Sequence, residues 1–241
     1  MKEIYDDDFY KSRHATTIYS AETILDSILK KLPPISTAAD FGCGIGSWLS
    51  YLKQKNIDVT GFEGPWVPLK YLKIPKDDFI QVNLAEELKN TQSIIWEQSK
   101  FDLSISLEVA EHLPPELADR FIELLTSRSK FILFSAAIPN QGGLHHVNEQ
   151  YPSYWISKFA KYNFACTDVI RSEIWNDIKI PFWYRQNIFL AYDVQFEGNL
   201  NCPMTPPLDL IHPDQVTLLL QRSEITLQKA IKYIYKKFFT R

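Results

Sequence analysis

The stretch that decides the fold is Ala39-Asp40-Phe41-Gly42-Cys43-Gly44-Ile45-Gly46. It follows a short β-rich run and opens a helical pattern, and this strand–turn–helix setting is what gives a glycine motif meaning. The chain of 241 residues has only 8 glycines, yet five of them fall between positions 42 and 64. Where glycine is this scarce, clustering indicates backbone that turns sharply or lies close against a ligand.

The spacing of this turn, G-x-G-x-G, separates two classes of cofactor. Ser47 stands where a nicotinamide-type G-x-G-x-x-G motif has its last glycine. Asp40 would repel a diphosphate, whereas S-adenosylmethionine has no phosphate and carries a cationic sulfonium and an ammonium group. The sequence therefore predicts S-adenosylmethionine rather than a dinucleotide.

A second acidic position supports this prediction. Glu63 lies in Thr60-Gly61-Phe62-Glu63-Gly64, about 20 residues after the glycine turn and at the end of the next predicted strand. A carboxylate at this place can accept both ribose hydroxyls. Taken alone, Glu63 would be an exposed turn residue, but its distance from the glycine turn favours binding. The predicted cofactor residues in these two turns are Asp40, Gly42, Cys43, Gly44, Gly46, Glu63 and Gly64.

Strand and helix patterns alternate along the chain. Strands are expected at 37–41, 59–62, 79–82, 101–107, 130–136, 164–170 and 188–194. Helices are expected at 20–31, 46–55, 84–95, 115–127 and 151–162. This alternation predicts an α/β fold with a mainly parallel sheet covered on both faces.

The chain shows no internal repeat and no flexible linker, so one main domain is expected at 1–200. Within it, we expect residues 1–19 to fold over the open end of the sheet as a lid segment. Residues 201–241 form a C-terminal extension that ends in an amphipathic helix beginning at Pro213. We favour a docking or homodimer role for this helix over a position on a membrane surface.

The composition limits the class of protein. Apolar residues make up 45% of the chain, enough for a hydrophobic core, so a disordered protein is excluded. No apolar run reaches the ~18 residues of a membrane helix, and the first residues lack a secretory signal. The 26 basic and 29 acidic residues give a net charge of -3, which argues against a general nucleic-acid binder. Three scattered cysteines fit a reducing compartment, and we expect a cytoplasmic protein.

Around these motifs the sequence resembles the class I S-adenosylmethionine-dependent methyltransferases over nearly its whole length. Five segments resemble a bacterial subgroup that modifies small molecules and glycans: residues 61–67 (GFEGPWV), 106–114 (SLEVAEHLP), 134–139 (FSAAIP), 141–155 (QGGLHHVNEQYPSYW) and 183–187 (WYRQN). The resemblance implies a Rossmann-like seven-stranded sheet in the order 3-2-1-4-5-7-6, with the last strand antiparallel and helices on both faces.

By the same resemblance, further residues should meet the methyl donor. Asn83 and Leu84, after the third strand, would contact the adenine, and Ser106, Leu107 and Glu108, after the fourth, would flank the methionyl part. Family members often have Asp where this chain has Asn83. An amide oxygen can still accept a hydrogen bond from the adenine amino group.

The segment after the fourth predicted strand contains carboxylates and an imidazole at a spacing that indicates a catalytic or metal site. Glu108, Glu111 and His112 are spaced i, i+3 and i+4, which places them on one side of a helical turn. This spacing is similar to the E-x-x-E-H motif of metal-dependent small-RNA 2′-O-methyltransferases and of ubiquinone-pathway O-methyltransferases. In those families a distant His completes the site, a part that His146, or with less support His145, would take here.

Two interpretations of this cluster stay open. Imidazole with carboxylates would suit Mn, Fe, Co or Zn better than Mg. In the alternative, no metal binds, the acidic side chains cap backbone amides and His112 packs against the strand end. His146 is then the general base, because an imidazole changes charge near neutral pH. The candidate catalytic residues are His146, Glu108, His112 and Glu111.

Aromatic side chains are dense in the segments expected around the acceptor. They are Tyr151, Tyr154, Trp155, Trp175, Trp183 and Tyr184. Such rings stack on sugars, and Arg185 or Asn187 could bind hydroxyls or a phosphate. We therefore predict an O-methyltransferase acting on a sugar, sugar-phosphate or nucleotide-linked sugar in surface-polysaccharide biosynthesis. The alternatives are an RNA 2′-O-methyltransferase and a non-catalytic scaffold subunit that binds the donor.

Overall fold

The computed structural model describes residues 7–90, 94–97, 99–202 and 204–239. It divides the chain into two compact units, Met1–Asp209 and Leu210–Arg241. The first unit is built around a central sheet, and the second is essentially one helix.

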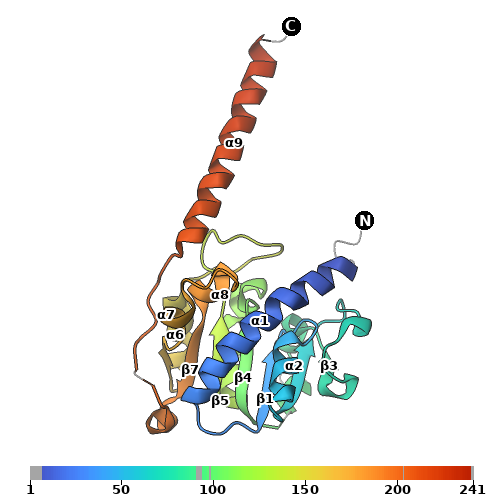
Figure 1. Ribbon diagram of the computed structural model, residues 1–241, viewed down its shortest axis with the longest axis vertical. Helices are drawn as coiled ribbons and strands as arrows, with labels where there is room; N and C mark the ends of the chain where they lie inside the picture. The colour runs from blue at the N-terminus through green and yellow to red at the C-terminus, as the bar shows by residue number, and fades with distance from the viewer. Residues whose placement is uncertain (1–6, 91–93, 98, 203, 240–241) are drawn as a thin grey trace. The chain divides into compact units, whose positions relative to one another are not determined.

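Seven strands form the sheet of the first unit (Figure 1). They are β1 (Thr37–Phe41), β2 (Asp58–Glu63), β3 (Phe79–Gln81), β4 (Phe101–Leu107), β5 (Ser129–Ser135), β6 (Phe164–Thr167) and β7 (Phe189–Asp193). Their spatial order is β3-β2-β1-β4-β5-β7-β6, with β7 antiparallel to both neighbours and the other pairs parallel. The predicted topology is confirmed.

The register of the central strands brings three loops together. Asp40 pairs with Gly61 of β2 on one side and with Ile105 of β4 on the other. Because these strands are parallel, their carboxyl ends lie at the same edge of the sheet. The glycine turn, the turn at Glu63 and the residues after β4 therefore converge.

Helices cover both faces of the sheet. They are α1 (Asp7–Lys31), α2 (Ser47–Gln54), α3 (Leu84–Glu87), α4 (Ile94–Glu97), α5 (Ala118–Arg128), α6 (Pro152–Ala160), α7 (Arg171–Ile174) and α8 (Phe182–Asn187). Helices α1 and α2 pack over one face, where Ala38 and Leu133 point, and α5 and α6 over the other, where Ala39 and Ile132 point. Alternate residues of each strand thus enter opposite cores, as a sheet buried on both faces requires.

Three of the expected elements differ most from the structure. Helix α1 begins at Asp7 rather than at residue 20, so residues 7–19 of the expected lid segment are the first turns of this helix. The helix expected at 84–95 is two short helices, α3 and α4, and residues 91–93 between them lie outside the described part. Strand β6 stops at Thr167 because the next amide, that of Asp168, donates to the carbonyl of Thr205 instead of to a neighbouring strand.

The second unit contains α9 (Pro213–Phe239). Val216, Leu220 and Leu227 on this helix are largely exposed. Within the described ranges, no helix combines the length and the apolar character that crossing a membrane requires.

Candidate active site

The glycine turn between β1 and α2 is tightly built. The amides of Gly42 and Cys43 both donate to the carbonyl of Phe62, at 2.8 and 3.2 Å, which ties the turn to β2. Gly42 has a φ of 90°, and a Cβ at this position would lie 2.3 Å from Val109. Gly44 has a φ of 55°, and a Cβ there would meet nothing within 4 Å. The turn therefore packs against protein at Gly42 and is open to a ligand at Gly44.

A buried and a half-buried carboxylate lie beside this opening. Asp40 is the penultimate residue of β1, and its burial raises its pKa well above the usual value, with the charge of Glu63 adding to the rise. Glu63 accepts hydrogen bonds from the amides of Gly44, at 2.8 Å, and Gly64, at 2.7 Å. Its pKa is also raised by burial, and these amides offset only part of the rise. A cationic ligand would relieve the repulsion between the two carboxylates.

The other predicted donor residues lie at the same edge of the sheet. The Asn83 side-chain oxygen accepts from the amide of Ala85 at 3.1 Å and so caps α3. Leu84 and Leu107 are buried. The Ser106 hydroxyl donates to the carbonyl of Phe41 at 3.1 Å, which holds the ends of β4 and β1 together.

The Glu108 carboxylate is held by the side-chain amides of two other residues. Its φ of 58° turns the chain sharply after β4, and its own amide donates to the carbonyl of Ser135. Its carboxylate accepts from Gln141 at 2.7 Å and from Asn187 at 3.0 Å. Burial raises its pKa, and these amide donors partly counter the rise. Glu108 is therefore a fixed, half-buried carboxylate and lies outside the group that Glu111 forms with the imidazoles.

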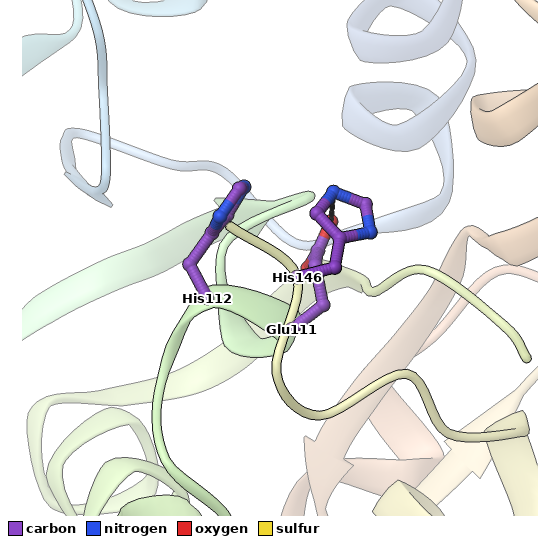
Figure 2. Close-up of side chains that lie close together, drawn as sticks. All are labelled: Glu111, His112 and His146. Atoms are coloured by element: carbon purple, nitrogen blue, oxygen red, sulfur yellow. Dashed lines mark ion pairs between the residues drawn. The ribbon is translucent and has the colours of Figure 1, made fainter. Parts of the chain in front are cut away.

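Glu111, His112 and His146 form a compact cluster (Figure 2). One ligand atom from each lies within 4.8 Å of the others. Glu111 is fully buried, and within the described ranges neither of its carboxylate oxygens has a hydrogen-bond partner. Burial first, and the charge of Glu108 second, raise its pKa well above the usual value, which the nearby amides of Glu111 and Ala137 offset in part. His146 Nε2 lies 4.0 Å from Glu111 Oε1, and its ring meets that of His112 edge-on at 4.8 Å.

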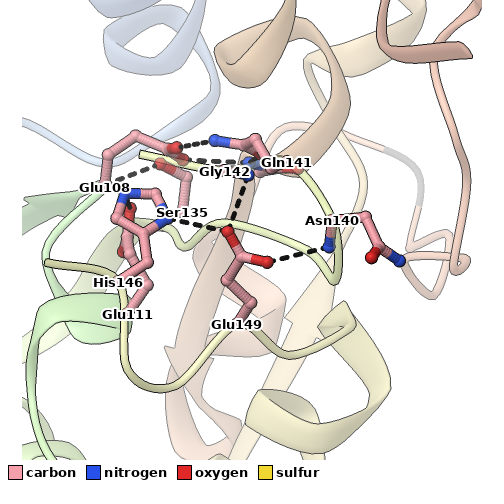
Figure 3. A network of polar contacts seen from close by, with 9 residues as sticks. Glu108, Glu111, Ser135, Asn140, Gln141, Gly142, His146 and Glu149 are labelled. Carbon is pink, nitrogen blue, oxygen red and sulfur yellow. Dashed lines mark hydrogen bonds and ion pairs between the residues drawn. The ribbon is translucent and has the colours of Figure 1, made fainter. Parts of the chain in front are cut away.

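The loop that carries His146 is held by a residue that the sequence reasoning missed. Glu149 accepts from the amides of Asn140 and Gly142, and its Oε1 lies 2.9 Å from His146 Nδ1 (Figure 3). The only signal in the sequence is that Glu149 lies three residues after His146. His145, the less favoured candidate, is exposed and has a φ of 62°.

The expected acceptor residues divide into two groups. Trp155 is buried in the core against Phe134, and the Arg185 guanidinium donates to the carbonyls of Ile180 and Trp175. Asn187 is buried and bound to Glu108. These three side chains therefore stabilise the folded structure and are not free to contact an acceptor. The remaining expected aromatic residues are half-buried: Tyr151, Tyr154, Trp175, Trp183 and Tyr184.

Helix α1 also reaches the donor end of the site. His14 Nδ1 lies 2.9 Å from the Ser47 hydroxyl, in the first turn of α2 directly after the glycine turn. Burial lowers the pKa of His14, and the charge of Lys73 lowers it further. Two basic side chains therefore lie near the glycine turn.

Residues 13–164 match the family model described as the methyltransferase domain. The chain belongs to this methyltransferase family. None of the curated proteins matches the sequence.

The fold of this methyltransferase is similar to that of two solved structures. One is the magnesium protoporphyrin IX methyltransferase of Synechocystis PCC 6803 with bound S-adenosylhomocysteine, at 17% identity, with a TM-score of 0.53, 74% of this chain and 84% of that chain covered. The other is an S-adenosylmethionine-dependent methyltransferase from Archaeoglobus fulgidus, at 14% identity, with a TM-score of 0.54, 78% of this chain and 100% of that chain covered.

The methyltransferase uses S-adenosylmethionine as its methyl donor, as predicted. The open face of Gly44, the buried carboxylate of Asp40 and the half-buried carboxylate of Glu63 suit a phosphate-free, cationic cofactor.

Proposed function

We propose that this methyltransferase transfers the methyl group to a hydroxyl of a small polar acceptor. The acceptor that we propose is a sugar, sugar-phosphate or nucleotide-linked sugar in surface-polysaccharide biosynthesis. The observation that carries the proposal is the placement of His146, whose Nε2 lies 4.0 Å from the buried carboxylate of Glu111, which has no hydrogen-bond partner among the described residues. An O-methyltransferase needs such a base because the pKa of a hydroxyl is far above neutral.

The proposed reaction is a direct displacement. The acceptor oxygen attacks the methyl carbon in line with the sulfur, and the carbon–sulfur bond breaks with its electron pair passing to sulfur. When no metal occupies the cluster, the hydroxyl proton passes to His146 Nε2, and the products are the methyl ether and S-adenosylhomocysteine. Glu108 and its amide partners keep the backbone after β4 in place during the transfer.

The half-buried aromatic residues support a carbohydrate-like acceptor. Trp183 and Tyr184 lie next to each other on α8, and the edge of Trp48 meets Tyr184 at 5.4 Å. Rings of this kind stack against the apolar faces of sugars. The near-neutral net charge of -3 offers little attraction to a nucleic-acid backbone, so we place RNA second.

The resemblance to E-x-x-E-H enzymes also implies a divalent metal, and the cluster fits one. Glu111, His112 and His146 supply three ligand atoms, and the buried oxygens of Glu111 lack other partners within the described residues. This donor set suits Mn, Fe, Co or Zn. Glu108 is not part of the set, because Gln141 and Asn187 occupy its carboxylate. A bound metal would make the acceptor hydroxyl more acidic.

The acceptor class is tested by following the release of S-adenosylhomocysteine. Sugars, sugar phosphates, nucleotide-linked sugars and oligoribonucleotides are supplied in parallel to the wild type and to His146→Ala. We expect turnover with a carbohydrate that falls ~100-fold or more in the variant, as removal of a general base does. Transfer to RNA alone would reject the carbohydrate proposal.

The metal is tested on protein purified without chelator. We expect about one equivalent of metal in the wild type and its loss in Glu111→Gln, which removes a charged ligand while keeping the shape of the side chain. Glu116→Gln, an exposed residue, is the matched control. If the wild type contains no metal and its turnover does not respond to added Mn, Fe, Co or Zn, the metal proposal is rejected. His146 then acts as a general base without a metal.

We also propose that α9 pairs with a second copy of the chain. Val216, Leu220 and Leu227 are exposed and spaced by four and seven residues. This is the spacing of a coiled-coil seam, which an identical helix can cover.

A further inference from the structure

The loop between β5 and α6 fixes the His146 imidazole more tightly than a surface loop requires. We propose that Glu149 is a positioning residue that holds His146 in the tautomer protonated on Nδ1, so that Nε2 presents its lone pair toward Glu111 and His112. The proposal deepens the proposed function, because it rests on His146 as the group that receives the acceptor proton or binds a metal.

The hydrogen bonds of Glu149 decide the tautomer. Its Oε1 accepts from the amide of Gly142 at 2.7 Å, and its Oε2 accepts from the amide of Asn140 at 2.8 Å. Backbone amides can only donate, so both oxygens act as acceptors toward the loop. His146 Nδ1 lies 2.9 Å from the same Oε1. Glu149 in its carboxylate form has no proton to give, so the imidazole donates from Nδ1, and in the neutral ring Nε2 then has no proton.

The surroundings of the ring hold this orientation. A Cβ on Gly143 would lie 2.1 Å from His146 Nε2, so a glycine is required for the ring to sit where it does. His112 packs edge-on against the ring, with an interplanar angle of 90°. Only 12% of the His146 side chain is exposed. The imidazole is therefore enclosed by Glu149, Gly143 and His112 while Nε2 stays near Glu111.

This arrangement has a direct chemical use. The 4.0 Å between Nε2 and Glu111 Oε1 is too long for a hydrogen bond, and a hydroxyl oxygen beside both atoms can contact each. When Nε2 takes the hydroxyl proton, the Glu149 carboxylate stabilises the imidazolium through the same Nδ1–H bond. The opposite tautomer would place a proton on Nε2, and that nitrogen could then neither accept a proton nor bind a metal.

The tautomer is measurable without any substrate. In 15N-labelled protein free of S-adenosylmethionine and metal, long-range 1H–15N spectra identify which imidazole nitrogen carries the proton. His146→Ala assigns the signals, because only one ring disappears. We expect His146 to be protonated on Nδ1. Protonation of the neutral ring on Nε2 in the wild type would overturn the proposal.

Glu149→Gln tests the cause. The amide that replaces the carboxylate has one acceptor and one donor end, so it cannot accept from both backbone amides and from Nδ1. We expect a shift of His146 toward the Nε2-protonated form and a fall in kcat of about 10 to 100-fold, the range seen when partners of functional histidines are removed. KM for donor and acceptor should stay within about twofold, and Glu149→Asp should restore part of kcat.

Glu116→Gln is the matched control and should match the wild type in both readouts. An unchanged tautomer and unchanged kcat in Glu149→Gln would refute the positioning role. If Glu149→Gln does not fold, the wild-type spectrum decides alone. The two proposals can fail separately. If no carbohydrate is methylated in the acceptor screen, the tautomer of His146 can still be measured. If the wild-type ring is protonated on Nε2, the proposal of a hydroxyl acceptor still stands and is tested by the screen.

Discussion

A side chain at position 44 would point into open space, whereas one at position 42 would strike Val109. The two glycines of one turn therefore differ, since Gly42 allows the turn to pack, and we propose that Gly44 leaves room for the donor. Glu63 accepts the amide of Gly44, and we propose that its remaining lone pairs accept the ribose hydroxyls. Single substitutions can separate these roles.

Gly44→Asp should fold and bind the donor poorly. Asp tolerates the left-handed backbone found at Gly44, but its side chain would occupy the space beside the turn. We expect the Kd for S-adenosylmethionine, measured by titration calorimetry, to rise at least about tenfold, equal to ~1.4 kcal/mol. Gly198→Asp is a control, because a side chain there also meets nothing within 4 Å. Unchanged affinity in Gly44→Asp would show that the donor binds elsewhere.

The raised pKa of Glu63 predicts how donor binding responds to pH. Burial favours the protonated form, and a protonated Glu63 can no longer accept from both ribose hydroxyls. Affinity should therefore be highest above the raised folded pKa and fall as the pH drops through it. Calorimetry between pH 8 and 5 should show this decline, and Glu63→Gln should flatten it. A decline of equal size in the variant would assign the effect to Asp40 alone.

In the absence of donor, the stability contributed by Glu63 changes with pH in the opposite direction to donor affinity: it falls as the pH rises. The folded state holds the Glu63 proton more tightly than the unfolded chain does. The resulting stabilisation is complete below the unfolded pKa of about 4.3 and is lost as the pH rises through the folded value. The buried carboxylate is thus a cost at neutral pH that the donor offsets.

At the scale of elements, α1 links the core to the donor turn. The middle of the helix packs on the sheet through Ile24 and Ile28, and its early turns bring His14 to Ser47. We expect residues 7–19 to close over the bound donor as the first turns of this helix.

His14→Ala tests this closure. The variant removes the contact with Ser47, and we expect S-adenosylmethionine to dissociate about three to tenfold faster in stopped-flow measurements, with thermal stability nearly unchanged. Thr16→Ala, an exposed change one half-turn away, is the control. An unchanged dissociation rate would mean that α1 serves only the core.

The sequence predicted some elements better than others, for identifiable reasons. β1 and β4 have the bounds expected for them, and both lie in the interior of the sheet. The short helices α7 and α8 were not expected, since four to six residues give no helical period. In the site, residue types and spacing led to Glu111, His112 and His146, whose proximity the structure shows. The tasks of Glu149, Arg185 and Asn187 depend on contacts between distant segments, which no local pattern reveals.

At the scale of the whole molecule, the exposed apolar residues of α9 lead us to expect a dimer. Replacing Leu220 and Leu227 by Glu puts like charges into the proposed seam. We expect the wild type to sediment as a dimer and the double variant as a monomer with unchanged donor affinity. Thr217→Glu with Gln221→Glu carries the same added charge and serves as the control. A wild type that sediments as a monomer at micromolar concentration would refute the pairing.

Donor binding should also be visible in the stability of the entire chain. A ligand present at 100 times its Kd adds about 2.7 kcal/mol to the stability of the folded state. For a protein of this size that corresponds to a rise in Tm of roughly 5 to 10 °C. Scanning calorimetry with and without S-adenosylmethionine checks this value, and Gly44→Asp should show little of the rise.

The burial of Asp40 next to Glu63 has a consequence for the lifetime of the enzyme in a cell. An empty enzyme keeps the buried Asp40 carboxylate close to that of Glu63 without a cation between them, so we expect it to spend more time partly open, where proteases cut. Methionine starvation, which depletes the donor, should therefore speed the degradation of this protein. The amount of enzyme would then follow the supply of the methyl groups that it transfers.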